Sequence, residues 1–312
     1  MTSRFRYLMI LAALSTIGLS LFGCGGGKLS LANKSAPELF ALGKEKFDAG
    51  KYVPAVSYFQ TLVYNYPGEP IVDTAQYYLA LSYFRNKEYA LAQVEFNRLV
   101  LNYPSSAYFI QSVFMKAVCF FEGTPKNYGL DQSDLETAIK QFEDFIVDYP
   151  ESELVPDAKK YLLTARSRMA EKFYSAAIVY DHVGAYKAAK IYYQKVVDDY
   201  TDTPFASQAT FGIALMDYKL KNYDDARDKF DNFLKVFPKD ELAAKANELV
   251  VEAAFKSGEK AYKSGNYDLA KEKFESFMKN FPDSKKKQDA GEYLKKIQQT
   301  SLTDTGEENA KS

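Results

Sequence analysis

Four positions recur six times along the chain at one spacing, and this repeat limits the fold more than any other feature of the sequence. An aromatic residue or leucine is followed by alanine three positions later, by phenylalanine or tyrosine at the seventh position, and by proline, or once threonine, at the fifteenth. Positions 0, 3 and 7 lie on one face of an α-helix, so each copy predicts a helix with one buried stripe that ends at the proline. The six copies are Tyr52-Ala55-Phe59-Pro67, Tyr89-Ala92-Phe96-Pro104, Leu135-Ala138-Phe142-Pro150, Tyr186-Ala189-Tyr193-Thr201, Tyr223-Ala226-Phe230-Pro238 and Tyr267-Ala270-Phe274-Pro282.

A short break precedes most of these helices and predicts a partner helix before each of them. Glycine or asparagine stands in the breaks, for example at residues 49–51, 221–222 and 265–266. Both residue types suit a left-handed cap at the end of a preceding helix. Each copy therefore predicts helix, tight turn, helix and proline. We expect an all-α fold, a right-handed solenoid of about six helical hairpins over residues 36–298.

Unequal intervals between the copies indicate where the hairpins differ. Residues 123–129 (Gly-Thr-Pro-Lys-Asn-Tyr-Gly) predict a loop in the third hairpin. No glycine or proline interrupts residues 157–183, so we predict one long helix there, and a lengthened helix over residues 241–257 as well. Residues 299–312 have no apolar periodicity and are expected to form a disordered tail.

The N-terminal segment has the features of a secretory leader that ends at a cysteine. Arg4 and Arg6 precede an apolar stretch, residues 7–22, which is short for a membrane-spanning helix but fits a signal peptide. Leu21-Phe22-Gly23-Cys24 resembles a lipobox, which implies a signal peptide over residues 1–23 and a covalent lipid on Cys24. Residues 24–35 would then be the acylated cysteine and a flexible tether. The alternative is a plain secretory leader in which Cys24 is incidental.

The inventory of reactive side chains argues against an enzyme. His182 is the only histidine, and Cys24 and Cys119 are the only cysteines, which leaves no usual metal cluster and few nucleophile–base pairs. We expect His182 to end a helix and Cys119 to be a small buried residue. The 40 basic and 41 acidic side chains nearly cancel, so nucleic acid is not an expected partner. Apart from the covalent lipid on Cys24, we expect no cofactor and no metal.

Two resemblances to known families add to this interpretation. The first copy is similar to the tetratricopeptide repeat, because Leu42-Gly43, Ala55, Phe59 and Pro67 stand at that family's spacing, although its signature tryptophan is missing. Residues 165–177 and the following Gly184-Ala185-Tyr186 resemble the long-helix segment of the BamD family of outer-membrane assembly lipoproteins. The lipobox and the loop in the third copy are similar too. The resemblance covers roughly residues 35–242, so the sixth hairpin extends beyond it.

The resemblance to the BamD family implies a periplasmic scaffold that is anchored to the outer membrane through Cys24. Gly25, directly after the cysteine, favours the outer membrane by the sorting rule of enteric bacteria. The implied partners are the β-barrel insertase BamA, other assembly lipoproteins and unfolded outer-membrane proteins. The implied function is assembly and insertion of β-barrel proteins, without catalysis. The alternative is a repeat lipoprotein that scaffolds envelope division or peptidoglycan machinery.

Aromatic residues on the first helices of hairpins one and two form a candidate peptide groove. The repeat places Phe40, Phe47, Tyr77 and Phe84 near the concave side, with Arg85 alongside. Flat apolar rings and one donor for a carboxylate would suit an extended peptide. The alternative is that these rings only pack between hairpins.

Overall fold

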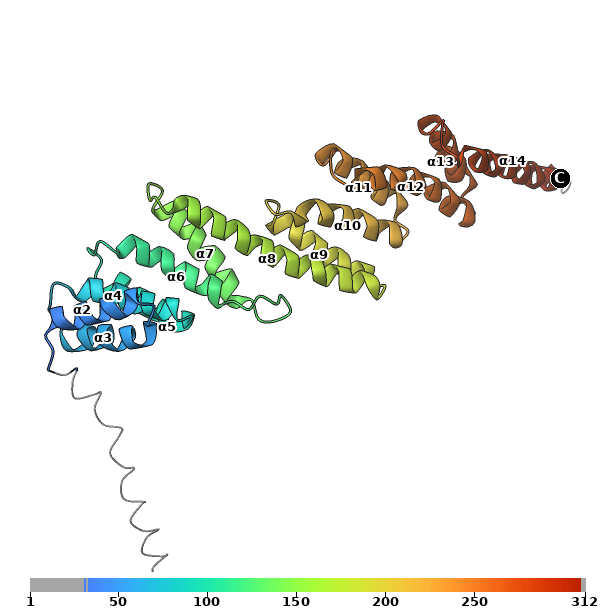
Figure 1. Ribbon diagram of the computed structural model, residues 1–312. Helices are drawn as coiled ribbons and strands as arrows, with labels where there is room; N and C mark the ends of the chain where they lie inside the picture. The colour runs from blue at the N-terminus through green and yellow to red at the C-terminus, as the bar shows by residue number, and fades with distance from the viewer. Residues whose placement is uncertain (1–30, 32, 310–312) are drawn as a thin grey trace, which may run out of the picture. The chain divides into compact units, whose positions relative to one another are not determined.

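The computed structural model describes residues 31 and 33–309, and over these residues it contains thirteen α-helices and no strand (Figure 1). The predicted signal peptide, Cys24 and most of the predicted tether lie outside the described residues. The chain divides into two compact units. The first holds the described residues up to 125 and residues 131–162, and the second holds residues 126–130 and the residues from 163 onward.

Within each unit, consecutive helices pack against each other, which confirms the predicted all-α repeat architecture. The predicted long helix is α8, and the predicted loop separates α6 from α7. The first unit holds α2 (Ala36–Asp48), α3 (Tyr52–Asn65), α4 (Val72–Arg85), α5 (Tyr89–Asn102), α6 (Phe109–Gly123), α7 (Ser133–Asp148) and the start of α8 (Val155–His182). The second holds the rest of α8, α9 (Tyr186–Asp199), α10 (Phe205–Lys219), α11 (Tyr223–Val236), α12 (Ala243–Lys263), α13 (Tyr267–Asn280) and α14 (Lys287–Asn309).

The second helix of every hairpin buries the stripe that the repeat predicted. All six repeat alanines are fully buried, and so is the ring at the seventh position in every copy except at Tyr193, which is 5% exposed. A further buried position, at offset ten, was not predicted, although it continues the stripe by one more turn of the helix. Its six residues are Leu62, Leu99, Phe145, Val196, Phe233 and Phe277.

An aromatic residue, rather than proline, is common to the ends of these six helices. Each helix ends two residues before the fifteenth position of its copy, and the residue between is tyrosine or phenylalanine. Tyr200 precedes Thr201 instead of proline, yet its backbone N–H still donates to the carbonyl of Val196 (3.0 Å) as the chain leaves the helix. Its ring stacks on Phe173 with centroids 5.9 Å apart. At this position α9 therefore ends before a packed aromatic ring without a proline after it.

The tight turns between paired helices use a left-handed residue, as predicted, but not always the residue type predicted. Glycine takes this role at Gly50, Gly184 and Gly265, with φ between +71° and +77°. In two other turns the asparagines keep negative φ, and the left-handed residues are Lys87 (φ +64°) and Lys221 (φ +62°). A side chain in this conformation costs about 1–2 kcal/mol, so the turn geometry is imposed by the packed helices on either side.

We predict that Lys87→Gly raises the free energy of unfolding by about 0.5–1 kcal/mol, because relief of the left-handed strain exceeds the extra chain entropy that glycine loses on folding. Lys51→Gly is the matched control: it lies in the equivalent turn of the first hairpin but has φ −92°, so glycine should only destabilise there. Urea melts of both variants measure the difference. Equal changes in the two variants would contradict the prediction.

A buried carboxylate links three helices of the second unit. The side chain of Asp217, on α10, is 1% exposed and accepts hydrogen bonds from Nζ of Lys190 on α9 and Nζ of Lys229 on α11, both at 2.6 Å. Burial raises the pKa of Asp217, but the hydrogen bonds and charges of the two lysines lower it by more, so its pKa lies below the ordinary value. Asp217 is therefore charged at neutral pH and bridges neighbouring hairpins.

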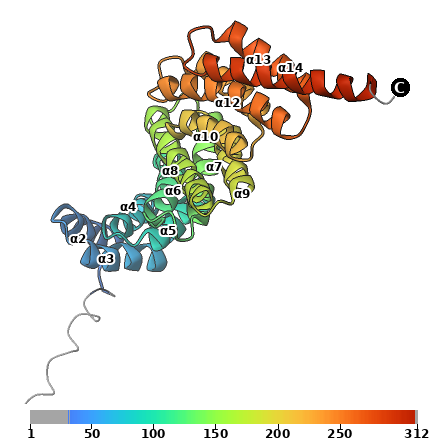
Figure 2. The ribbon, with the colours of Figure 1, turned by 90° about the vertical axis from the view of Figure 1, so that its right-hand side faces the viewer.

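Helix α14 closes the second unit and lies beyond the last proline of the repeat, Pro282. Figure 2 shows it beside α13, and its buried residues Ala290 and Ile297 belong to the core that Phe274 and Phe277 also form. Its outer face is polar, as the terminal helix of a repeat stack requires. The helix continues past residue 298, the expected end of the solenoid, to Asn309.

Candidate peptide-binding surface

Two of the predicted groove residues, Phe40 and Phe47 on α2, pack against a tyrosine that was not among them. The Phe40 and Phe47 rings lie edge-on to Tyr78 of α4, with centroids 6.0 Å and 5.3 Å away. Tyr78 in turn stacks on Phe59 at 5.7 Å. Phe40 and Phe47 are both half-buried, so one side of each ring belongs to the core of the first hairpin and the rest reaches solvent.

Tyr77, the third predicted residue, lies in the core. Its side chain is 5% exposed and stacks on Tyr108 at 4.3 Å, with Phe96 5.9 Å away. Burial raises the pKa of Tyr77 to about 12, and the neighbouring Tyr78 and Tyr108 add to this. The ring has no face left for a peptide, because α4 is packed between its neighbours and Tyr77 points toward α5 and α6. For Tyr77 the packing alternative holds.

Phe84 and Arg85 are the last two residues of α4. Phe84 is half-buried and lies edge-on to Tyr89 at 5.4 Å, while Arg85 is exposed. The structure therefore brings Phe84 to the turn between α4 and α5 and brings Phe40 and Phe47 to Tyr78. That Phe40, Phe47, Phe84 and Arg85 contact a peptide stays a prediction.

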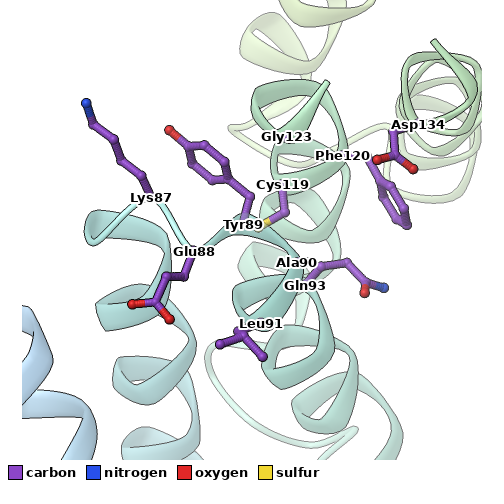
Figure 3. A pocket seen from close by; sticks show the side chains of 10 residues that line it. All are labelled: Lys87, Glu88, Tyr89, Ala90, Leu91, Gln93, Cys119, Phe120, Gly123 and Asp134. Carbon is purple, nitrogen blue, oxygen red and sulfur yellow. The ribbon is translucent and has the colours of Figure 1, made fainter. Parts of the chain in front are cut away.

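A pocket of about 500 Å³ opens next to this turn, and we call it the turn pocket. Its walls are formed by the start of α5, the end of α6 and the start of α7. Phe84 does not line the pocket but contacts Tyr89, which does. Lys87 and Asp134 lie on opposite sides of the pocket in Figure 3. The lining residues are Lys87, Glu88, Tyr89, Ala90, Leu91, Gln93, Cys119, Phe120, Gly123 and Asp134.

The turn pocket is lined by apolar, charged and polar side chains. Tyr89, Leu91 and Phe120 line it and offer apolar contacts, and Lys87, Glu88 and Asp134 add charges of both signs. Burial raises the pKa of the Cys119 thiol to about 12, so the sulfur is a neutral thiol and a poor nucleophile at neutral pH. Burial, and then the charge of Glu122, raise the pKa of Tyr89 as well.

The sequence contains one signal for this pocket that the repeat pattern obscured. Tyr89 was assigned to the buried stripe as the first position of its copy, and Leu91 lies outside the stripe. Leu91 is nevertheless apolar and 48% exposed. A large apolar residue outside a buried stripe is a reason to look for a partner surface.

Over the described part of the chain, no three histidine, cysteine, aspartate or glutamate side chains come together as metal ligands. No helix within residues 33–309 is both long and apolar enough to cross a bilayer. His182 is the last residue of α8, as predicted, and its side chain is exposed.

Comparisons with known proteins cover most of the chain. The family model YfiO, described as an outer membrane lipoprotein, matches residues 32–216. A tetratricopeptide repeat model matches residues 208–240 and 252–284, which contain α10–α11 and α12–α13. A solved structure of the yeast Sti1 TPR2AB domain in complex with pHSP90 covers 84% of this chain and 98% of its own, at 14% identity and a TM-score of 0.38.

The curated relatives in these comparisons carry one description. The chain is 24% identical over 199 residues to outer membrane protein assembly factor BamD of Caulobacter vibrioides, which is 62% of this chain and 65% of that one. It is 22% identical over 228 residues to the BamD of Vibrio cholerae, which is 70% of this chain and 94% of that one. The chain thus spans slightly less than two thirds of the Caulobacter relative and nearly all of the Vibrio one.

Proposed function

Because the chain belongs to the YfiO/BamD family of outer membrane lipoproteins, we propose that it is a non-catalytic periplasmic scaffold for the assembly of β-barrel proteins. In this role it docks on the β-barrel insertase BamA and other assembly lipoproteins, and it binds unfolded outer-membrane proteins. The observation that carries the proposal is the family match over residues 32–216. The turn pocket offers a surface on which a partner can bind. Among the described residues, the one thiol is protonated and no metal-ligand cluster is present.

Affinity purification from native membranes tests the proposed partners. The full chain, tagged at its C-terminus and extracted in mild detergent, is expected to recover the β-barrel insertase. Recovery of division or peptidoglycan proteins without the insertase would favour the alternative scaffold and overturn the proposal. A tagged unrelated lipoprotein is the control for detergent carry-over.

We propose that Cys24 carries the lipid anchor, and we expect Cys24→Ala to move the protein from the membrane to the soluble fraction, because the acyl chains supply the anchoring energy. Cys119→Ala is the matched control: Cys119 is buried in the second hairpin core, so its loss should leave attachment unchanged. Membrane fractionation with a high-salt wash separates lipid anchoring from attachment by charge. A Cys24→Ala protein that stays bound after the wash would show that another contact dominates.

The turn pocket is our candidate for the contact with unfolded barrel proteins. An extended peptide binds through a few aromatic anchors rather than through its total area. The apolar walls of the pocket accept such a ring, and Arg85 and Lys87 stand two residues apart on the same turn as donors for a carboxylate. Phe40 and Phe47 offer further half-buried rings on the same unit, and in this proposal Phe84 acts by holding Tyr89 in place.

We expect Leu91→Glu to weaken the binding of a labelled C-terminal peptide of a barrel protein at least tenfold, about 1.4 kcal/mol. The substitution would replace an apolar contact surface with a negative charge, which repels the terminal carboxylate of the peptide. Leu101→Glu is the control, since Leu101 lies on the same helix, is 70% exposed and does not line the pocket. Fluorescence anisotropy measures affinity, and circular dichroism checks that both variants stay folded. Equal affinities would place the peptide elsewhere.

A further inference from the structure

A second pocket lies in the part of the chain that the YfiO family model does not match. It has a volume of about 270 Å³ and is formed by the turn between α10 and α11 and by one face of α12. Its lining residues are Lys221, Tyr223, Lys256, Glu259, Lys260 and Lys263, and we call it the lysine pocket. The family match ends at residue 216, so the lysine pocket is a feature of the last hairpins.

The lysine pocket is held in shape by its own residues. Lys256, Lys260 and Lys263 follow the i, i+4, i+7 spacing and share one face of α12. Nζ of Lys260 donates to the backbone carbonyl of Lys221 at 2.9 Å, which fixes the helix against the turn. Lys221 is the left-handed residue of that turn, so its place in the pocket wall is set by the hairpin geometry.

The charges in the lysine pocket do not balance. Four lysines and one glutamate line it, which leaves a formal charge of +3 in a chain whose net charge is −1. Glu259 is already occupied: it accepts hydrogen bonds from Lys256 (2.7 Å) and from the Tyr293 hydroxyl (3.1 Å). Lys221, Lys260 and Lys263 form no ion pair with a carboxylate among the described residues.

Burial raises the pKa of Glu259, but the hydrogen bonds from Lys256 and Tyr293 lower it by more, so its pKa lies below the ordinary value. Glu259 is therefore already ionised at neutral pH, and its charge is included in the pocket's excess of +3. Four lysines line this one pocket and a single glutamate offsets one of their charges, so the remaining positive charges repel each other. An incoming anion relieves that repulsion and gains charge-assisted hydrogen bonds.

We propose that the lysine pocket binds a carboxylate-rich segment of a partner protein, with two neighbouring acidic groups, one of which can be a C-terminal carboxylate. The pocket is a recess between a turn and a helix, so it receives side chains of a single extended segment. Tyr223, which is half-buried, supplies an apolar wall for the stem of an acidic side chain.

A lipid surface is the less favoured occupant. Proteins that bind bilayers through their surface combine basic residues with exposed apolar or aromatic side chains that enter the interface. None of the large exposed apolar residues of the described chain lines the lysine pocket. The proposal stands on the pocket alone and does not depend on the proposed role in barrel assembly.

The test uses the full chain and a fluorescein-labelled peptide that ends in two glutamates and a free carboxylate. The comparison peptide carries glutamine and a C-terminal amide. Lys221→Gln with Lys263→Gln leaves the Lys260 contact in place and is expected to weaken binding of the acidic peptide at least tenfold, with a smaller salt dependence. The matched control is Lys239→Gln with Lys271→Gln, which removes one exposed turn lysine and one exposed helix lysine from the same unit.

The expected result is that only the pocket variant loses affinity and that wild-type protein prefers the acidic peptide over the amide. Equal losses in both variants would mean general charge attraction and would overturn the proposal, as would equal binding of the two peptides. Flotation with phosphatidylcholine vesicles, with and without phosphatidylglycerol, measures whether the protein binds an anionic lipid surface. Binding to the anionic vesicles that depends on Lys221 and Lys263, without a preference for the acidic peptide, would assign the pocket to lipid instead.

Discussion

Replacing Tyr77 with alanine is expected to lower the free energy of unfolding by about 3–5 kcal/mol, the usual cost of removing a buried aromatic ring. The ring fills the space between α4 and the two helices that follow, where it contacts Phe96 and Tyr108. Tyr77→Phe keeps the ring and should change stability by less than about 1.5 kcal/mol. Guanidinium melts of both variants compare the loss of the ring with the loss of the hydroxyl.

Tyr128→Ala is the surface control for this experiment, because Tyr128 lies in the loop between α6 and α7 and is exposed. Its effect should stay within about ±0.5 kcal/mol. If Tyr77→Ala were as mild as Tyr128→Ala, the ring would not be core, and the original assignment of Tyr77 to a peptide groove would stand again.

The second large effect is expected from removing both lysines that face Asp217. Lys190→Met with Lys229→Met should lower the free energy of unfolding by about 3–5 kcal/mol at neutral pH, because the buried carboxylate loses both compensating charges. The loss of stability is expected to be large because the Asp217 side chain, on α10, is only 1% exposed and water cannot replace the lysines. The single variants keep one ammonium group and should each cost less than the pair.

The pH dependence identifies the cause. In the wild type, the pKa of Asp217 is below its ordinary value, so its contribution to stability is present above the unfolded pKa of about 3.9. That contribution is lost as pH falls through the folded pKa. In the double variant, burial alone acts and the pKa of Asp217 rises, so the stability deficit should shrink as the pH is lowered from about 7 toward 5. Adding Asp217→Asn to the double variant should remove this pH dependence, and a deficit that is independent of pH would contradict the explanation.

The repeat register could be predicted from the sequence because each landmark has a physical role that does not depend on its surroundings. Ala226 must be small and Phe230 must be buried wherever two helices cross closely. The left-handed turns were predicted too, but the assignment to asparagine failed at Asn222. The hairpin needs that conformation one residue earlier, at Lys221, and the packing of two helices outweighs a preference of about 1–2 kcal/mol.

The candidate site was harder to predict, because it depends on which of two adjacent residues points inward. Tyr77 and Tyr78 are neighbours of one type, and only the packing of α4 against α5, with Tyr108 stacked on Tyr77, places Tyr77 in the core. The repeat pattern does not extend into helix α14. Its apolar residues Ala290 and Ile297 are spaced for a helix but are flanked by lysine and glutamine, without the aromatic and proline landmarks of the other copies.

The pairing of each helix with the next one in the chain has a consequence for how the protein folds. Within each unit, the strong contacts between described helices all join helices that are consecutive in sequence. The protein therefore has a low contact order, and closing each hairpin requires only a short loop with a small entropic cost. A chain of this kind can fold one hairpin at a time from whichever end is first available. For a protein that crosses a membrane N-terminus first, α2 and α3 can form their hairpin while the later hairpins are still extended.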